Sequence, residues 1–152
     1  MPLMKKLYYD YQTFKEDTNK LLQKIPNDYQ AIIAISRGGL TFAQALSEAL
    51  DIRDLQTIQT QLYDKEKKRE HITIVDNTSL SNNYAKVLIV DDIADSGETL
   101  KAVVDHLQNR YPSICFETIT LFYKQTSIYK PTYWIKEAKE WIEFFWEVDF
   151  TL

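Results

Sequence analysis

Residues 87–99 run Val-Leu-Ile-Val-Asp-Asp-Ile-Ala-Asp-Ser-Gly-Glu-Thr, and the rest of the chain can be organised around them. The four uninterrupted apolar residues at 87–90 predict a strand that is buried on both faces. Apolar residues then recur at helical spacing from Leu100 to Leu107, so the small residues before them open a helix. The stretch therefore predicts a strand, an acidic turn and a helix in direct succession.

The acidic turn and the start of the helix offer two kinds of ligand-binding group side by side. The first turn of a helix has free backbone N–H groups and the positive end of the helix dipole, which together suit a phosphate. Ser96 and Thr99 add hydroxyl donors, and Gly97 lets the backbone approach an anion closely. Asp91 and Asp92 follow the strand, where they could hold sugar hydroxyls or a hydrated Mg²⁺. The groups together suit a ligand that carries a phosphate, a sugar and a metal.

This pattern resembles, through Thr99, the phosphoribosyl-diphosphate (PRPP) signature of the type I phosphoribosyltransferases. That signature is an apolar strand, two acids, two spacers, Asp, Ser or Thr, Gly, any residue and Thr. Other classes also place acids after an apolar strand. A P-loop enzyme would need Gly-x-x-x-x-Gly-Lys-Ser/Thr, which the sequence lacks. A receiver domain would need more chain than the residues at 93–152 provide. A plain buried strand followed by an ordinary capped helix is the remaining alternative.

Composition predicts one domain, covering residues 1–152. With 152 residues, 45% of them hydrophobic and only three of them glycine, the chain can bury a sizeable core and is not expected to be disordered. The net charge of −4 argues against broad nucleic-acid binding. The one cysteine, Cys115, is expected to be a small buried core residue in a reducing cytoplasm. No stretch approaches the length of a membrane span, so we expect a cytoplasmic protein.

A second strand–loop–helix unit precedes the first in the chain. Residues 31–35 are uninterruptedly apolar, residues 36–39 are Ser-Arg-Gly-Gly, and a helix with apolar residues from Leu40 to Leu50 follows. Two such units predict an α/β fold, with a parallel twisted sheet flanked by helices. Ligands collect at the carboxyl ends of parallel strands. The loops at Ser36 and Asp92 are therefore expected to open on the same edge.

The remaining elements follow from shorter patterns. Thr13 and Glu16 have capping-box spacing at the start of an amphipathic helix. Strand-like composition covers 55–63 and 72–75, and another apolar-rich strand is expected at 115–122.

The charged run at 64–71 joins two of these strands. The run has no apolar anchor, so composition favours a solvated hairpin tip. In the family that the sequence resembles, this region is a mobile hood loop that closes during the reaction. There Lys67, Lys68 and Arg69 would help to neutralise the diphosphate, and the sequence does not choose among them.

The C-terminal part narrows the resemblance to the bacterial xanthine-guanine (hypoxanthine) phosphoribosyltransferases. It carries Lys124 after an apolar strand, then Trp141-Ile142-Glu143, and a second Trp-acid pair downstream. The resemblance implies that Trp141 stacks on a purine and that Lys124 contacts its exocyclic oxygen. The Ile142 carbonyl would accept from the 2-amino group of guanine, in a small base-binding region formed by the C-terminal segment and the hood. The spacer Phe144-Phe145 departs from the family pattern, which leaves the choice of purine open.

The resemblance implies a Mg²⁺-dependent transferase of purine salvage. It would join guanine, xanthine or hypoxanthine to PRPP, with GMP, XMP or IMP and pyrophosphate as products. Asp95 would be the catalytic residue that accepts the purine N7 proton, and Asp92 would be linked to Mg²⁺. Glu98 is compatible with a phosphate only if its side chain points outward. The implied PRPP-binding residues are Ser36, Arg37, Gly38, Asp91, Asp92, Asp95, Ser96, Gly97, Glu98 and Thr99.

One further expectation concerns assembly. By analogy with the fold, and from the apolar C-terminal segment, we expect a homo-oligomer, either a dimer or a tetramer. Two functional alternatives stay open. One is a PRPP-sensing regulator of the same fold that binds nucleic acid, and the other is a phosphoribosyltransferase for adenine or orotate.

Overall fold

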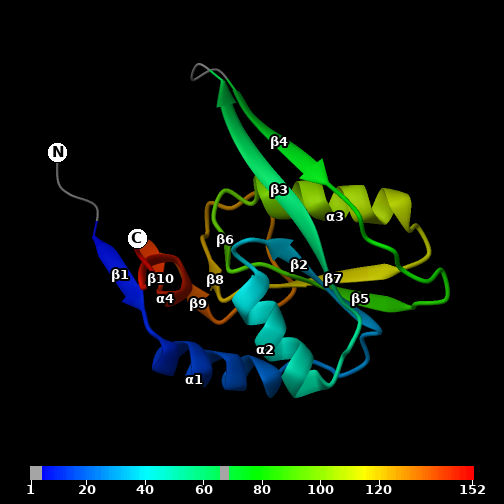
Figure 1. The fold of residues 1–152 in the computed structure, drawn as a ribbon, viewed down its shortest axis with the longest axis horizontal. Helices are drawn as coiled ribbons and strands as arrows, with labels where there is room; N and C mark the ends of the chain where they lie inside the picture. Colours follow the sequence, from blue (N-terminus) through cyan, green and yellow to red (C-terminus); the bar gives the residue numbers. More distant parts are fainter. Residues whose placement is uncertain (1–4, 66–68) are drawn as a thin grey trace.

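The computed structural model describes residues 5–65 and 69–152, without the side chains of 62–65 and 69–71 (Figure 1). In chain order its elements are β1 (Lys6–Tyr9), α1 (Tyr11–Leu22), β2 (Ala31–Ser36), α2 (Leu40–Leu50), β3 (Leu55–Lys65), β4 (Arg69–Val75), β5 (Lys86–Val90), β6 (Ile93–Ala94), α3 (Glu98–Arg110), β7 (Cys115–Ile119), β8 (Phe122–Tyr123), β9 (Lys136–Glu137), β10 (Trp141–Phe144) and α4 (Phe145–Val148).

The central sheet has five strands in the order β4–β3–β2–β5–β7. Strands β3, β2, β5 and β7 run parallel, and β4 is antiparallel to β3. Ala31 is in register with Val87, so the strands of the two predicted strand–loop–helix units lie next to each other and end at the same edge. The predicted α/β fold with a mostly parallel sheet is confirmed.

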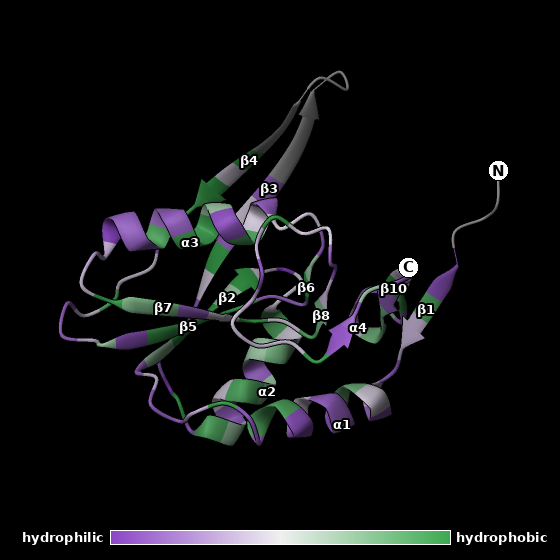
Figure 2. Cartoon of the chain, turned by 180° about the vertical axis from the view of Figure 1, so that it is seen from behind, coloured by the Kyte–Doolittle hydropathy of each residue, from purple (hydrophilic) through white to green (hydrophobic). Residues whose placement is uncertain are grey.

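Helices cover both faces of this sheet, which explains the uninterrupted apolar strands. Successive side chains of a strand point to opposite faces. Ile32 and Leu88 pack in one cluster with α1 and α2, whereas Ile33 and Ile89 pack in a second cluster with α3. Figure 1 shows α1 and α2 on one side of the sheet and α3 on the other. In Figure 2, α1 and α3 carry alternating hydrophobic and hydrophilic bands, as expected for helices with one buried face.

Two small sheets lie beside the central one, and they correct one prediction. The strand predicted at 115–122 is split into β7 and β8, and β8 belongs to the separate sheet β6–β8–β9. The split occurs because the N–H groups of Leu121 and Phe122 both donate to the carbonyl of Asp92, at 3.0 and 3.2 Å. The chain thereby leaves the central sheet just beyond its carboxyl edge. The other small sheet is the parallel pair β1–β10.

Two further details of the sequence analysis were wrong. Helix α1 begins earlier than the capping-box spacing predicted, because Asp10 is the N-cap and its carboxylate accepts from the Thr13 N–H at 2.8 Å. Cys115 is exposed and is not a core residue. It is the first residue of the outermost strand, β7, where burial begins only further along the strand.

The β3–β4 hairpin projects away from the body of the protein (Figure 1). Its base is held to α3 by Asp76, whose side chain is 6% exposed. One Asp76 oxygen accepts from the Thr78 N–H at 2.8 Å, and the other lies 2.8 Å from Arg110 Nη1 and from His106 Nε2. Burial alone would raise the pKa of Asp76, but the hydrogen bonds from Thr78 and Arg110 lower it to about 2.

We expect Asp76→Asn to destabilise the protein at neutral pH by about 2 kcal/mol, the value that corresponds to this pKa shift. The pKa is lower in the folded state than in the unfolded state, so the stabilisation is present above about pH 4 and is lost as the pH falls toward 2. Urea unfolding of the wild type and of Asp76→Asn at pH 7 and pH 3 measures the difference in the free energy of unfolding. The exposed Asp105→Asn is the control. An equal difference between wild type and Asp76→Asn at both pH values would contradict the prediction.

None of the helices in the described part of the chain has the length and apolar character that a membrane crossing needs.

Candidate active site

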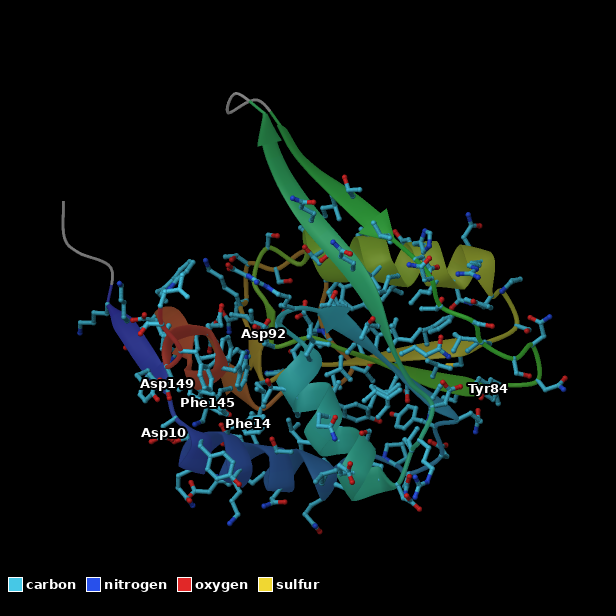
Figure 3. All side chains as sticks on the ribbon, viewed as in Figure 1. Asp10, Phe14, Tyr84, Asp92, Phe145 and Asp149 are labelled. Atoms are coloured by element: carbon cyan, nitrogen blue, oxygen red, sulfur yellow. The ribbon has the colours of Figure 1, made fainter. Side chains whose placement is uncertain are left out.

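The loops after β2 and β5 form one cavity of about 700 Å³ at the carboxyl edge of the central sheet. Its lining includes Arg37 from one loop and Asp92 from the other, so the predicted meeting of the two loops is confirmed. Figure 3 labels Asp92 near the start of α2. The loop after β2 approaches the loop after β5 closely. A Cβ built on Gly38 would lie 2.7 Å from Asp92 Oδ2, and one on Gly39 would overlap the carbonyl oxygen of Val90. Small residues there let the first loop close over the acidic turn.

The turn from β6 into α3 wraps a second, adjoining cavity of about 240 Å³. Gly97 is the N-cap of α3 with φ at +83°, in the left-handed region that glycine tolerates best. The Ser96 hydroxyl oxygen accepts from the Glu98 N–H at 3.2 Å, and the Ser96 carbonyl accepts from the Ile128 N–H at 2.8 Å. A Cβ at Gly97 would overlap Ser127 Oγ. The turn is therefore held in place by residues 127–129, and Ser96, Gly97 and Thr99 line the cavity.

Asp91 and Asp92 are buried beside each other, at 9% and 8% exposure. Asp91 Oδ1 accepts from the Asp92 N–H at 2.9 Å. Burial, followed by the charge of Asp92, raises the pKa of Asp91 well above its usual value. Burial raises the pKa of Asp92 to about 6, and the charge of Glu147 adds to this. Among the described residues neither carboxylate has a Lys, Arg or His nitrogen within 4 Å. Two buried carboxylates of this kind suit a bound cation.

A third cavity, of about 320 Å³, lies on the other side of Asp92 and Asp95. One wall carries Lys124, whose Nζ lies 3.4 Å from Asp95 Oδ1. Residues 138–142 form another wall, and Trp141 is 54% exposed. The cavity combines an apolar surface and an aromatic ring with one cationic and one anionic group, which suits a flat heterocycle that has hydrogen-bonding edges.

The structure brings together nearly all of the predicted site residues. The lining of the first two cavities includes Ser36, Arg37, Gly38, Asp91, Asp92, Asp95, Ser96, Gly97 and Thr99, and that of the third includes Lys124, Trp141 and Ile142. Glu98, which was also among the predicted PRPP-binding residues, lines none of the three cavities. Lys67 and Lys68 lie outside the described residues, as does the side chain of Arg69.

Sequence reasoning missed Glu147, which lines both the first and the third cavity. It also missed Thr60 and Lys139, which line the first and the third cavity respectively. A pattern in the sequence could have indicated Glu147, because it belongs to the second Trp-acid pair, Trp146-Glu147, of the C-terminal segment. No local pattern marks the other two.

Comparisons with known proteins agree with this arrangement. Residues 6–151 match the family described as the phosphoribosyl transferase domain. The xanthine-guanine phosphoribosyltransferase of Cereibacter sphaeroides is 32% identical over 79% of this chain and 70% of its own length. The structure of the Helicobacter pylori xanthine-guanine-hypoxanthine phosphoribosyltransferase is 34% identical with a TM-score of 0.87, covering 95% of this chain and 96% of that one. The Pyrococcus horikoshii purine phosphoribosyltransferase is 29% identical with a TM-score of 0.83, covering 98% and 97%.

Proposed function

Because the chain belongs to the phosphoribosyl transferase domain family, we propose that it is a purine salvage enzyme that joins a 6-oxopurine to PRPP. The products would be a nucleoside 5′-monophosphate (GMP, XMP or IMP) and pyrophosphate. One observation carries the proposal: Asp95 lines both the cavity of the phosphate turn and the cavity with the exposed aromatic ring. A sugar bound between the two cavities would have its carbon 1 next to this carboxylate.

The PRPP molecule would occupy the first two cavities. The backbone N–H groups at 96–99, with the hydroxyls of Ser96 and Thr99, would bind its 5′-phosphate at the positive end of α3. Arg37, with the loop around it, would bind the diphosphate through charge-assisted hydrogen bonds. The carboxylates of Asp91 and Asp92 would accept hydrogen bonds from the ribose hydroxyls.

Mg²⁺ dependence is part of the proposal. Mg²⁺ takes six oxygen ligands, keeps several waters, and is usually bound by one or two carboxylates together with substrate phosphates. The buried pair Asp91–Asp92 fits this use, and the carboxylate of Asp92 lies against Gly38 of the diphosphate loop and is influenced by the charge of Glu147. When bound, the metal would neutralise charge on the departing pyrophosphate. The protein's own part is to hold the sugar and the diphosphate in one orientation.

The base would lie in the third cavity. Trp141 would stack on the purine ring, Lys124 would donate to the 6-oxo group, and the Ile142 carbonyl would accept from a 2-amino group. Carbon 1 of the ribose becomes cation-like as the bond to pyrophosphate lengthens, so catalysis depends on positioning and on nearby negative charge. Asp95 would accept the N7 proton as the purine nitrogen bonds to carbon 1.

The proposal extends to assembly and location. The exposed apolar residues near the two ends of the chain, Tyr8, Tyr11, Val148 and Phe150, support a homo-oligomer. The single cysteine supports a reducing, cytoplasmic location.

The experiment that tests this function is pyrophosphate release from PRPP and Mg²⁺, with guanine, xanthine, hypoxanthine, adenine and orotate offered separately. We expect turnover with the 6-oxopurines only, because Lys124 is a donor that pairs with a 6-oxo group and not with the 6-amino group of adenine. Trp141→Ala should raise KM for the base by about tenfold or more, the value of one stacked base, with little change in KM for PRPP. Turnover with adenine or orotate would contradict the base assignment. PRPP binding without turnover of any base would favour a regulator.

We expect Asp92→Asn to stabilise the protein while it weakens function. The pKa of Asp92 is raised in the folded state, so its charge at neutral pH disfavours folding, and a neutral amide of the same shape removes that cost. The same change should raise the Mg²⁺ concentration needed for half-maximal activity by about tenfold or more. Thermal unfolding without ligand and activity over a Mg²⁺ series measure the two effects. A lower unfolding temperature, or an unchanged Mg²⁺ requirement, would contradict the prediction.

A further inference from the structure

A buried carboxylate outside the active site joins β1 and α1, near the start of the chain, to β9, more than a hundred residues later. Asp17 of α1 is 2% exposed, and its Oδ2 accepts from the Tyr9 hydroxyl of β1 at 2.6 Å. The same oxygen lies 3.1 Å from Lys136 Nζ of β9. That ammonium group also sits over the Tyr9 ring, 5.7 Å from its centroid. We call Tyr9, Asp17 and Lys136 the α1 triad.

Packing alone does not explain a charged residue at the position of Asp17, because burying its carboxylate costs free energy that an apolar residue would not. Asp17 is buried whereas the Lys136 side chain is 40% exposed, so removing the lysine would leave the buried carboxylate without its counter-charge. Burial, followed by the hydrogen bond to Asp17, raises the pKa of Tyr9, so its hydroxyl stays protonated and donates. Such a network is geometrically demanding, because each partner must lie within hydrogen-bonding distance of one carboxylate. It therefore fixes β1 and β9 relative to α1.

Lys136 is fixed in this way at the start of the 138–142 wall of the third cavity. It is in register with Phe122 of β8, and the Ala138 N–H donates to the Tyr123 carbonyl at 2.9 Å. Lys124, on the other wall, follows Tyr123 directly. The distance between the two walls is thus set by the β8–β9 pair, which Lys136 anchors to α1.

Tyr9 is fixed at the other end of the same wall. It is in register with Phe144 of β10, with ring centroids 5.6 Å apart. The Trp141 N–H, at the start of β10, donates to the Lys5 carbonyl at 3.0 Å. Strand β1 therefore holds the backbone of β10, and Trp141 and Ile142 of that strand line the cavity. Figure 3 shows the neighbouring contact of α1 with this segment, where Phe14 and Phe145 lie close together.

We propose that Asp17 is a positioning residue for the base, because it holds both ends of the wall that carries Trp141 and Ile142. The inference rests on the proposed function, since it treats the third cavity as the base site. The phosphate turn is built by β5, β6 and α3 and shares no hydrogen bond or ion pair with the α1 triad among the interactions of the described residues. Loss of the triad should therefore affect the base and leave PRPP nearly unaffected.

Asp17→Asn is the direct test, because it keeps the shape and the acceptor for Tyr9 and removes the charge that pairs with Lys136. We expect KM for guanine to rise by about tenfold and KM for PRPP to change by less than about twofold, since small misplacements of a binding group have effects of this size. Lys136→Gln, at a 40% exposed side chain, is the second variant in case Asp17→Asn folds poorly. It should give the same selective rise.

The matched control is Asp10→Ala, which removes the N-cap hydrogen bond of the same helix and keeps all three side chains of the triad, with the Tyr9–Asp17 hydrogen bond and the Asp17–Lys136 ion pair. It should lower the unfolding temperature and leave KM for guanine unchanged. An equal rise of KM for guanine in Asp10→Ala and Asp17→Asn would overturn the inference, because the effect would then follow from the stability of α1 alone.

Amide hydrogen exchange adds a measurement that does not depend on activity. Asp17→Asn should speed exchange in 136–142 and leave 98–110 unchanged. Unchanged exchange in 136–142 would overturn the inference. A wild-type protein that turns over no purine would instead contradict the proposed function, so the two failures can be told apart.

Discussion

Asp95→Asn is expected to lower kcat for the 6-oxopurine reaction by about 10²–10³-fold, because an amide cannot accept the N7 proton as the base forms its new bond. KM for PRPP should change little, since the amide keeps the shape of the turn at 94–97. The structure adds a second expectation. Lys124 Nζ lies 3.4 Å from Asp95 Oδ1, so removing that carboxylate frees the ammonium group for the 6-oxo group of the base. KM for the base should therefore not rise.

Single-turnover kinetics with guanine and saturating PRPP measure this effect directly, because they separate the chemical step from product release. Asp105→Asn serves as the control, since this residue is an exposed acid of α3 that, among the described residues, pairs with Lys101 alone. If Asp95→Asn kept the wild-type rate of the chemical step, another group would have to take the proton. The role proposed for Asp95 would then be wrong.

The central sheet was predictable because burial on two faces leaves a direct signature in sequence. Strands β2 and β5 each contain at least four consecutive apolar residues, and only a strand covered by helices on both sides needs them. The phosphate turn was predictable for a similar local reason. Its acids, hydroxyls and glycine follow each other within nine residues, 91–99, and one backbone turn positions them all.

The C-terminal wall was harder to predict, because contacts between distant segments decide it. Nothing near residue 120 shows that the Asp92 carbonyl takes two N–H groups from 121 and 122 and so ends β7. Asp17 has the spacing of an ordinary polar residue on a helix, and its burial becomes visible only when Tyr9 and Lys136 are in place. Glu147 reaches the site because α4 turns back beside Asp92. The end of β7, the burial of Asp17 and the position of Glu147 each depend on contacts between elements that a local sequence pattern does not show.

Gly97→Ala is expected to reduce PRPP affinity by about 10²-fold, because it forces the phosphate turn out of shape. Two independent effects act at this residue. Its φ of +83° is unfavourable for any residue with a Cβ, and that Cβ would overlap Ser127 Oγ and lie 2.6 Å from the Tyr129 N. The N–H groups at 96–99 are displaced if the turn moves to relieve either effect. Titration calorimetry with PRPP and Mg²⁺ measures the loss.

Ser127→Ala separates the two effects. Alone it should leave PRPP affinity within about twofold of wild type, because Ser127 Oγ bonds only within its own loop among the described contacts. Combined with Gly97→Ala it removes one overlap but keeps the strained φ and the contact with the Tyr129 N, so affinity should recover only in part. Full recovery would mean that the side-chain overlap is the whole effect. Unchanged PRPP affinity in Gly97→Ala itself would mean that the phosphate binds elsewhere. If the turn bound the 5′-phosphate through its N–H groups, the shift that makes room for the new Cβ would weaken those hydrogen bonds.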